Sequence, residues 1–365
     1  MIYLDNGATS FPKPAAVKRA VIAAMERCAN PGRGGHPAAM AAAETVYRCR
    51  EEAGQFFHCD PERVVFTQNC THGLNIAIRS LVESGDRVVI SGFEHNAVTR
   101  PLHAVGARMV VAGRQLFDPE DTLEQLEIGL KKGAKAAVFT HISNVFGYIL
   151  PVAQMALLCR QYGVPFVIDA AQSAGVVDID FESLGASFVA LPGHKGLLGP
   201  TGTGILLCGQ LPKPVLFGGT GSLSMEQTMP DFLPDRAEAG TLNVPGIAGL
   251  LAGIREVKKQ GTRQILARQQ RQVRRCISGL RELGCAVFEG RDQAGTLSFL
   301  PGRDCEETAR LLGQNGIAVR AGLHCAPLAH ESAGTLSTGT VRLSFGHDAS
   351  DGQTAGFLRI MGKLS

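Results

Sequence analysis

The chain has no tryptophan and only four tyrosines among its 365 residues. So few large aromatic rings disfavour a platform on which nucleic-acid bases stack. The net charge is also small: 36 basic and 33 acidic residues leave a formal charge of +3. This value is well below the basic excess of nucleic-acid binders. No apolar run approaches the roughly 18 residues that a membrane-spanning helix needs. We therefore expect neither a nucleic-acid partner nor a membrane anchor.

The ten cysteines form no recognisable framework. No two have the C-x-x-C spacing and none is grouped with histidines at metal-ligand spacing, so we predict neither disulfides nor a metal site. Four lie in helix-like patterns and are expected to be small buried residues of a reducing compartment: Cys28, Cys49, Cys159 and Cys276. The first residues lack the basic start and apolar run of a secretory signal, which favours the cytoplasm.

What the chain does contain is an alternation of short Val- and Ile-rich segments with longer amphipathic ones. Hydrophobic residues make up 45% and charged residues 19%, as in globular proteins. Such alternation is typical of parallel βα units. Strands are expected near 63–67, 86–91, 107–111, 134–140, 165–169, 187–191 and 204–208, and helices near 71–82, 121–132 and 152–162. We predict a large doubly wound, mostly parallel α/β domain over residues 13–245.

The pattern changes after residue 245, where a long charged amphipathic segment begins. Helices are expected at 262–283, 305–314 and 351–363, and strands at 285–288, 295–300, 317–320 and 341–345. Residues 1–12 and 246–365 are therefore predicted to form a smaller α+β domain. No internal repeat or low-complexity linker separates the two domains, so we expect them to pack together.

Residues 192–204 form a glycine-rich turn that holds Lys195 just after a buried strand. Desolvation would lower the pKa of this lysine and free its amine for Schiff-base chemistry. A lysine in such a turn is more often an exposed charge, so this motif needs a second signal. A nucleotide site is disfavoured, because the segment GPTGTG lacks the GK[ST] ending and leads into a strand instead of a helix.

The second signal is Asp169, at the end of the strand predicted at 165–169. Ligands of α/β sheets bind at this edge. Alone, Asp169 would serve equally well as the cap of the next helix. Followed along the chain by Lys195, it can keep a pyridinium nitrogen protonated, and this combination of lysine and aspartate is the one that pyridoxal 5′-phosphate requires.

Three further motifs follow strands of the same domain. Cys70 and Thr71 open a helix whose backbone N–H groups suit a phosphate. His95 follows another strand, where its imidazole can stack on an aromatic ring, and Asn144 offers an amide after a third. Each motif is weak alone, because polar residues at strand ends often satisfy loop backbone. Together and in this order they predict a pyridoxal-phosphate site.

With these motifs, and from Tyr3-Leu4-Asp5-Asn6-Gly7-Ala8-Thr9 to the last helix, the chain resembles the cysteine desulfurases. These enzymes belong to the class V aminotransferase group of fold-type I pyridoxal-phosphate-dependent transferases. The resemblance implies that Lys195 holds the cofactor as a Schiff base, that Asp169 binds the pyridine nitrogen and that His95 stacks on the ring. It implies further cofactor contacts from Gln172, Asn144, Cys70, Thr71 and His194. Thr241, in the segment 236–241, would cross the interface of a homodimer to the partner's phosphate.

The segment 320–327 resembles the catalytic-cysteine loop of group II desulfurases, the branch similar to selenocysteine lyase. The resemblance makes Cys325 the nucleophile, which Arg320 and His324 would help toward the thiolate. Arg342 would bind the substrate carboxylate with its planar fork of donors. Further substrate contacts are expected from Arg320, Asn144, Ala8 and His36. Cys325 as another buried cysteine and His36 as an ordinary loop residue remain open alternatives.

The chain departs from the family pattern at three places. Pro192 stands where relatives have a serine or threonine that donates to the phosphate, and His72 stands where glutamate is common. A Gly346-His347-Asp348 segment replaces the Tyr-Asn pair after Arg342. These changes leave the main cofactor residues in place and put the substrate pocket in doubt.

The resemblance implies conversion of L-cysteine to L-alanine, with the sulfur left as a persulfide on Cys325. An unidentified acceptor protein would then take the sulfur, for example for iron–sulfur cluster assembly. A selenocysteine lyase acting on L-selenocysteine, or another class V aminotransferase or lyase, is the first alternative. A pyridoxal-phosphate-binding scaffold that relays sulfur without turnover is the second.

Overall fold

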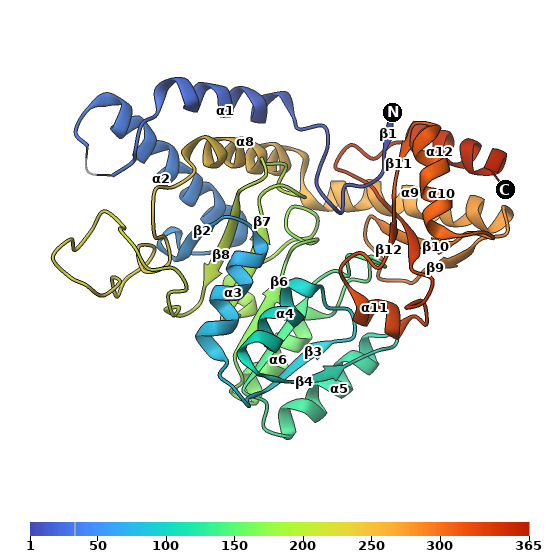
Figure 1. The fold of residues 1–365 in the computed structure, drawn as a ribbon, viewed down its shortest axis with the longest axis horizontal. Helices are drawn as coiled ribbons and strands as arrows, with labels where there is room; N and C mark the ends of the chain where they lie inside the picture. Colours follow the sequence, from blue (N-terminus) through green and yellow to red (C-terminus); the bar gives the residue numbers. More distant parts are fainter. Residues whose placement is uncertain (33, 365) are drawn as a thin grey trace.

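The computed structural model describes residues 1–32 and 34–364. It confirms the predicted fold class: a large, mostly parallel sheet lies beside a smaller sheet (Figure 1). The large sheet has seven strands in the order β2-β8-β7-β6-β5-β3-β4. Their bounds are β2 (Val64–Thr67), β3 (Arg87–Ser91), β4 (Arg108–Ala112), β5 (Ala136–Thr140), β6 (Phe166–Asp169), β7 (Phe188–Pro192) and β8 (Gly204–Cys208). Strand β8 is antiparallel to both neighbours, and the other pairs are parallel.

Helices cover both faces of this sheet. One face packs against α2 (Pro37–Phe57), α5 (Pro119–Lys131), α6 (Val152–Gln161), α7 (Phe181–Leu184) and α8 (Val244–Gln260). The other packs against α3 (Cys70–Leu81) and α4 (Asn96–Val105). Every residue of β5, β6, β7 and β8 is buried, which explains why these strands show continuous apolar runs instead of alternation. A short η1 turn (Pro61–Arg63) precedes β2, and α1 (Ala15–Arg27) packs on α8.

The smaller sheet is antiparallel, with the order β12-β13-β10-β9. Its strands are β9 (Ala286–Phe288), β10 (Thr296–Leu300), β12 (Arg320–Gly322) and β13 (Thr340–Ser344). It shares a hydrophobic core with α9 (Thr262–Glu282), α10 (Cys305–Gln314) and α12 (Asp351–Leu364). The short helix α11 (Pro327–Ser332) lies between this part and the large sheet (Figure 1). The domain division at residue 245 stays a prediction; α8 itself packs against α1 and α2.

The strand predicted at 317–320 is in fact two strands in different sheets. β11 (Ile317–Ala318) pairs in parallel with β1 (Ile2–Tyr3), whereas β12 pairs with β13. The partner of β11 comes from the other end of the chain, so a local pattern could not show this change of partner. Within the part of the chain that the structure describes, no helix has the length and apolar character to cross a bilayer.

Candidate active site

The polar residues predicted at strand ends meet at the carboxyl edge of the large sheet. They line one cavity of about 100 Å³, together with Lys195 from the turn after β7. Its lining includes Asn69, Cys70, Thr71, His95, Asn144, Asp169, Gln172, Pro192, His194 and Lys195. The fold therefore brings together, from five segments of the sequence, most of the side chains that the motif analysis selected.

Asp169 is held with one carboxylate oxygen free for a ligand. It ends β6 and is 2% exposed. Its Oδ1 accepts hydrogen bonds from the Ala171 amide at 2.9 Å and from the Cys70 thiol at 3.3 Å. No hydrogen bond to Oδ2 occurs within the described residues, so this oxygen is available to a protonated ring nitrogen placed in the cavity.

His95 is fixed as a neutral ring. Its Nδ1 caps α4 by accepting a hydrogen bond from the Ala97 amide at 3.0 Å, which leaves the proton on Nε2. Burial lowers the pKa of His95, and the nearby Asp169 opposes that shift. A neutral, fixed imidazole is suited to stack on a flat aromatic ligand.

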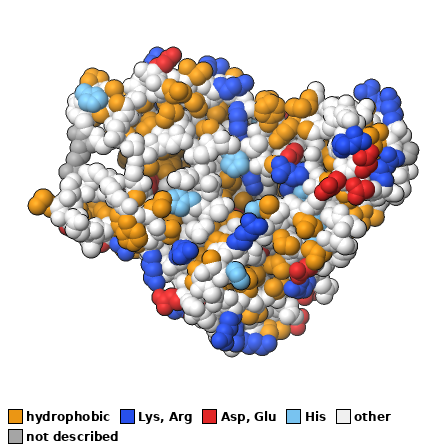
Figure 2. All heavy atoms as spheres, in the orientation of Figure 1, with side chains coloured by type: hydrophobic (Ala, Val, Ile, Leu, Met, Phe, Trp, Pro, Cys, Tyr) orange, Lys and Arg blue, Asp and Glu red, His pale blue; other side chains and the backbone are white. Residues whose placement is uncertain are grey.

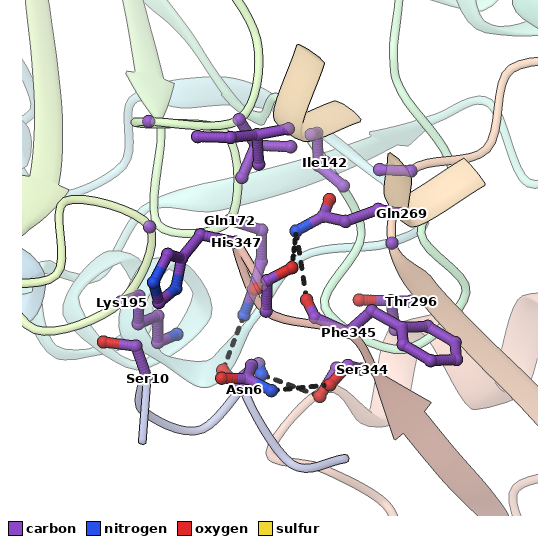
Figure 3. Close-up of a pocket in the computed structure, with 18 of the residues that line it drawn as sticks. Asn6, Ser10, Ile142, Gln172, Lys195, Gln269, Thr296, Ser344, Phe345 and His347 are labelled. Carbon is purple, nitrogen blue, oxygen red and sulfur yellow. Dashed lines mark hydrogen bonds between the residues drawn. The ribbon is translucent and has the colours of Figure 1, made fainter. Parts of the chain in front are cut away.

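Lys195 is half-buried, and burial lowers the pKa of its ammonium while Asp169 opposes that shift. The lysine also lines a second, smaller cavity of about 40 Å³ behind the first. Figure 3 shows Lys195, Ser10 and His347 on one side of that cavity, with Gln269 directed at the backbone of Phe345 across it. A partly desolvated amine between two cavities fits the predicted Schiff-base lysine.

The start of α3 supplies anion-binding groups next to this lysine. The Asn69 side chain caps the helix by accepting from the His72 amide at 2.9 Å, while the amides of Cys70 and Thr71 belong to the first turn and have no partner within the helix. His194 lies at the same end of the cavity, with Nδ1 3.1 Å from the Thr9 hydroxyl. Burial lowers the pKa of His194 to about 4, so it would meet a phosphate as a neutral donor.

The N-terminal segment lines the second cavity, through Asn6, Gly7 and Ser10. The Gln172 amide donates to the Gly7 carbonyl at 2.9 Å, and the Ala8 amide donates to the Asp5 carbonyl at 3.0 Å. Gly7 in turn donates to the Ser344 hydroxyl at 2.7 Å. Gln172, which lines the cofactor cavity, thus contacts the N-terminal segment, whereas Ala8 lines neither cavity.

Arg342 is buried at the centre of the predicted substrate side. It is 3% exposed; its Nη2 donates to Asp5 at 2.7 Å and its Nη1 to the backbone carbonyl of Asn144 at 3.0 Å. Its Nε is buried without a partner. An unpartnered donor on a buried guanidinium is costly, and an acceptor such as a ligand carboxylate would satisfy it.

Asp5 is a residue of this site that the sequence analysis missed. Its Oδ1 binds Arg342, and its Oδ2 accepts from Arg320 at 3.0 Å. An acidic residue in the first motif gives no sign of this role, because both arginines lie more than 300 positions away. Glu94 was also missed: it accepts from the Ser91 hydroxyl at 2.5 Å, and burial raises its pKa to about 8.

Cys325 is exposed, unlike the buried cysteine of the alternative interpretation, and lies at the turn between β12 and α11. The predicted help from His324 does not fit the structure. That imidazole is 8% exposed, its Nε2 lies 3.2 Å from the Thr340 carbonyl, and burial lowers its pKa to about 2. A ring that stays neutral adds no positive charge beside the thiol, and Arg320 is already paired with Asp5.

Six predicted site residues do not line the cofactor cavity: Ala8, His36, Thr241, Arg320, Cys325 and Arg342. Thr241 is exposed and lines a separate cavity of about 200 Å³ with Gln68 and His72. His36 is exposed and caps α2 through its Nδ1, 3.4 Å from the Ala39 amide. Arg33, in the same motif as His36, lies outside the described residues.

Pyridoxal phosphate fits the residues present. The cavity offers a free oxygen on a buried carboxylate, a fixed neutral imidazole, a partly desolvated lysine amine and the first-turn amides of α3. These groups match, in order, the ring nitrogen, the ring face, the aldehyde and the phosphate of that cofactor.

Comparison with known proteins supports this arrangement over nearly the whole chain. Residues 2–353 match the model of the aminotransferase class-V family. A probable cysteine desulfurase of Pyrococcus abyssi is 33% identical over 94% of this chain and 89% of its own length. A cysteine desulfurase of Escherichia coli O157:H7 is 32% identical over 99% of this chain and 93% of its own. The apo structure of a cysteine desulfurase from Thermococcus onnurineus NA1 superposes with a TM-score of 0.91 at 32% identity, covering 100% of this chain and 94% of that one.

Fold and site together define a fold-type I pyridoxal-phosphate enzyme of the aminotransferase class-V family. Within that class, the chain belongs to the cysteine desulfurases.

Proposed function

We propose that this enzyme converts L-cysteine to L-alanine and keeps the sulfur as a persulfide on Cys325. The observation that supports the proposal is the position of this exposed thiol. The Cys325 carbonyl accepts a hydrogen bond from the Asn96 amide at 2.7 Å, directly beside the cofactor-cavity residue His95. The thiol loop and the cofactor cavity are therefore in contact, as sulfur transfer requires.

Lys195, Asp169 and His95 would hold the cofactor, with its phosphate at the first turn of α3. When bound, pyridoxal phosphate withdraws electrons from the substrate's α-carbon. Burial lowers the pKa of Lys195; in its unprotonated form this amine would take the α-proton and return a proton later. Asp169 remains buried and supplies the negative charge that the ring nitrogen needs.

Arg342 would bind the substrate carboxylate through its unpartnered Nε. Cys325 would then attack the substrate sulfur as a thiolate. A sulfur–sulfur bond forms and the carbon–sulfur bond of the substrate breaks. The electron pair of the broken bond stays on the substrate's β-carbon, which takes a proton to give alanine. The products are alanine and the Cys325 persulfide, so atoms and electrons balance without another oxidant or reductant.

We propose that the enzyme works as a homodimer to which Thr241 contributes. Two features support this. Thr241 is exposed in the isolated chain and lines a cavity of about 550 Å³ together with the exposed Tyr47. Three further large apolar side chains are exposed: Met40, Phe217 and Met225. Figure 2 shows hydrophobic side chains on both lobes that flank the opening at the left edge of the molecule. A buried ion pair between Arg50 and Glu238 fixes the segment before Thr241.

We propose a cytoplasmic location and transfer of the sulfur to an acceptor protein, with iron–sulfur cluster assembly as one destination. All ten cysteines lack a disulfide partner, which suits a reducing compartment. Cys325 is exposed on a turn, where an acceptor can reach it.

Mass spectrometry after treatment with L-cysteine tests the proposed reaction. One added sulfur is expected on the peptide that contains Cys325, and alanine should appear in step with it. Cys325→Ser should keep the cofactor but lose the persulfide; Cys28→Ser, at a half-buried cysteine, is the matched control. Sulfur on Cys70, or full alanine formation by Cys325→Ser, would contradict the proposal. L-Selenocysteine in the same assay tests the selenocysteine lyase alternative.

A further inference from the structure

The loop that presents Cys325 has an unfavourable backbone conformation. Gly322, His324 and Cys325 have φ angles of +100°, +50° and +57°. Residues with a side chain avoid this left-handed region because Cβ approaches the following carbonyl oxygen. Two such residues in succession persist only where surrounding contacts determine their conformation. The contacts that hold this loop therefore also fix the place of the thiol.

Those contacts come mostly from outside the loop. The Asn144 side-chain amide donates to the His324 carbonyl at 2.8 Å, and the Asn96 backbone amide donates to the Cys325 carbonyl at 2.7 Å. The His324 ring lies against Thr340 of β13. Asn144 is 8% exposed and follows β5 of the large sheet, whereas the loop follows β12 of the small sheet. One buried amide thus joins the edge of the large sheet to the carbonyl of a strained residue.

Asn144 is also tied to the substrate side by its backbone. Its carbonyl accepts from Arg342 Nη1 at 3.0 Å. A single residue therefore contacts both the arginine expected to bind the carboxylate and the loop that presents the nucleophile.

We propose that Asn144 is a positioning residue for Cys325: its amide holds the left-handed turn so that the thiol faces the sulfur of a substrate bound at Arg342. This inference rests on the proposed function and deepens it. The alternative is that Asn144 contacts cofactor or substrate directly. Its Nδ2 already donates to His324, so the two roles predict different effects of substitution.

Hydrogen exchange in the cofactor-loaded and cofactor-free protein separates these roles. In Asn144→Ala and Asn144→Asp, the amides of Asn96 and Ala326 should exchange at least about tenfold faster, because each is hydrogen-bonded within or to the loop. Asn144→Asp keeps the shape of the side chain and removes its hydrogen-bond donors. It therefore tests the positioning role even if Asn144→Ala fails to fold. The rate of persulfide formation on Cys325 should fall by about 10- to 100-fold, as expected for a displaced reacting group.

Ser332→Ala is the matched control. Ser332 also joins the two parts of the molecule, by donating to the Gly92 carbonyl at 2.8 Å, but it does not touch the Cys325 loop. It should leave the exchange of Asn96 and Ala326 unchanged. Exchange within twofold of the unsubstituted protein in both Asn144 variants would overturn the inference, whatever their activity. Full alanine formation by Cys325→Ser would instead overturn the proposed function, so the two failures are distinguishable.

Discussion

The cofactor side and the substrate side of this site are built in different ways. On the cofactor side, the two residues expected to hold the ring bind backbone only two positions further along the chain: Asp169 binds the Ala171 amide and His95 binds the Ala97 amide. On the substrate side, the bonds join distant segments, such as Arg342 with Asp5. Local turns thus fix the first set, and the packing of the two sheets fixes the second.

This difference has a physical consequence. A residue held by its own turn keeps its geometry as long as its strand is in place. A residue held across the two sheets depends on their relative position. Substitutions on the cofactor side should therefore act through the cofactor alone, and those on the substrate side should change substrate affinity and the Cys325 loop together.

The largest effect is expected at Lys195, the centre of the cofactor side. Lys195→Ala removes the amine that would hold the cofactor and move the proton, so turnover should fall by about a thousandfold or more. Borohydride treatment followed by mass spectrometry should find no covalently fixed cofactor. Lys13→Ala, at a lysine that bonds to the His194 carbonyl, should still fix it. Fixation in the Lys195→Ala protein would show that another amine holds the cofactor.

The next largest effect is expected on the substrate side, from Asp5→Asn. This change removes the charged partner of a buried guanidinium. A hydrogen bond to a charged group contributes about 1.5–3 kcal/mol. KM for L-cysteine should change by about 10- to 100-fold while the cofactor absorption spectrum stays the same. Asp348→Asn, at an exposed aspartate in the same region, is the control. A loss of cofactor from Asp5→Asn would contradict the separation of the two sides.

The free energy of unfolding of the protein should depend on pH through buried histidines. Burial lowers the pKa of His141 and of His330 from 6.5 to about 4. Below pH 6.5 the unfolded chain therefore binds more protons than the folded one, so stability is full above that pH and falls as pH drops toward 4. At pH 5 each histidine should lower the free energy of unfolding by about 2 kcal/mol. Urea unfolding at pH 7.5 and pH 5 measures this.

Replacement of each histidine in turn shows whether it contributes to this pH dependence. His141→Gln, after β5, and His330→Gln, in α11, should each reduce the loss of stability at pH 5 by a similar amount. The exposed His103→Gln is the control. An unchanged pH dependence in both buried variants would contradict the assignment.

The smallest effect is expected at Cys70, beneath the cofactor site. Its thiol donates to Asp169 Oδ1 at 3.3 Å, a bond worth about 0.5–1.5 kcal/mol. Cys70→Ala should weaken cofactor binding by less than about tenfold, whereas Cys70→Ser, which keeps a donor, should stay near the original affinity. Titration of the cofactor-free protein measures both. If Cys70→Ala, Cys70→Ser and the unsubstituted protein bind the cofactor with equal affinity, this bond does not affect Asp169.

Sequence patterns located the cofactor side well. Asp169 ends its strand, and Lys195 and His95 lie in the turns that follow theirs. The carboxyl ends of parallel strands meet at one edge by geometry alone, so the order of these residues along the chain was enough to place them in one cavity. This reasoning did not locate Arg342 and Cys325, which were predicted only from the family resemblance. It also misjudged His324, because a motif does not show whether a ring points toward the thiol or into the core.

The amino-acid sequence by itself therefore determined the fold class, most of the strands and the polar residues that meet at the carboxyl edge of the large sheet, because each depends on hydrophobic periodicity or on the order of strands along the chain. Only the tertiary structure decided that Asp5 binds both arginines, that segment 317–320 divides between two sheets and that Asn144 holds the Cys325 loop. These features join segments from opposite ends of the chain. Their geometry is set by how the two sheets pack, which no local pattern of residues records.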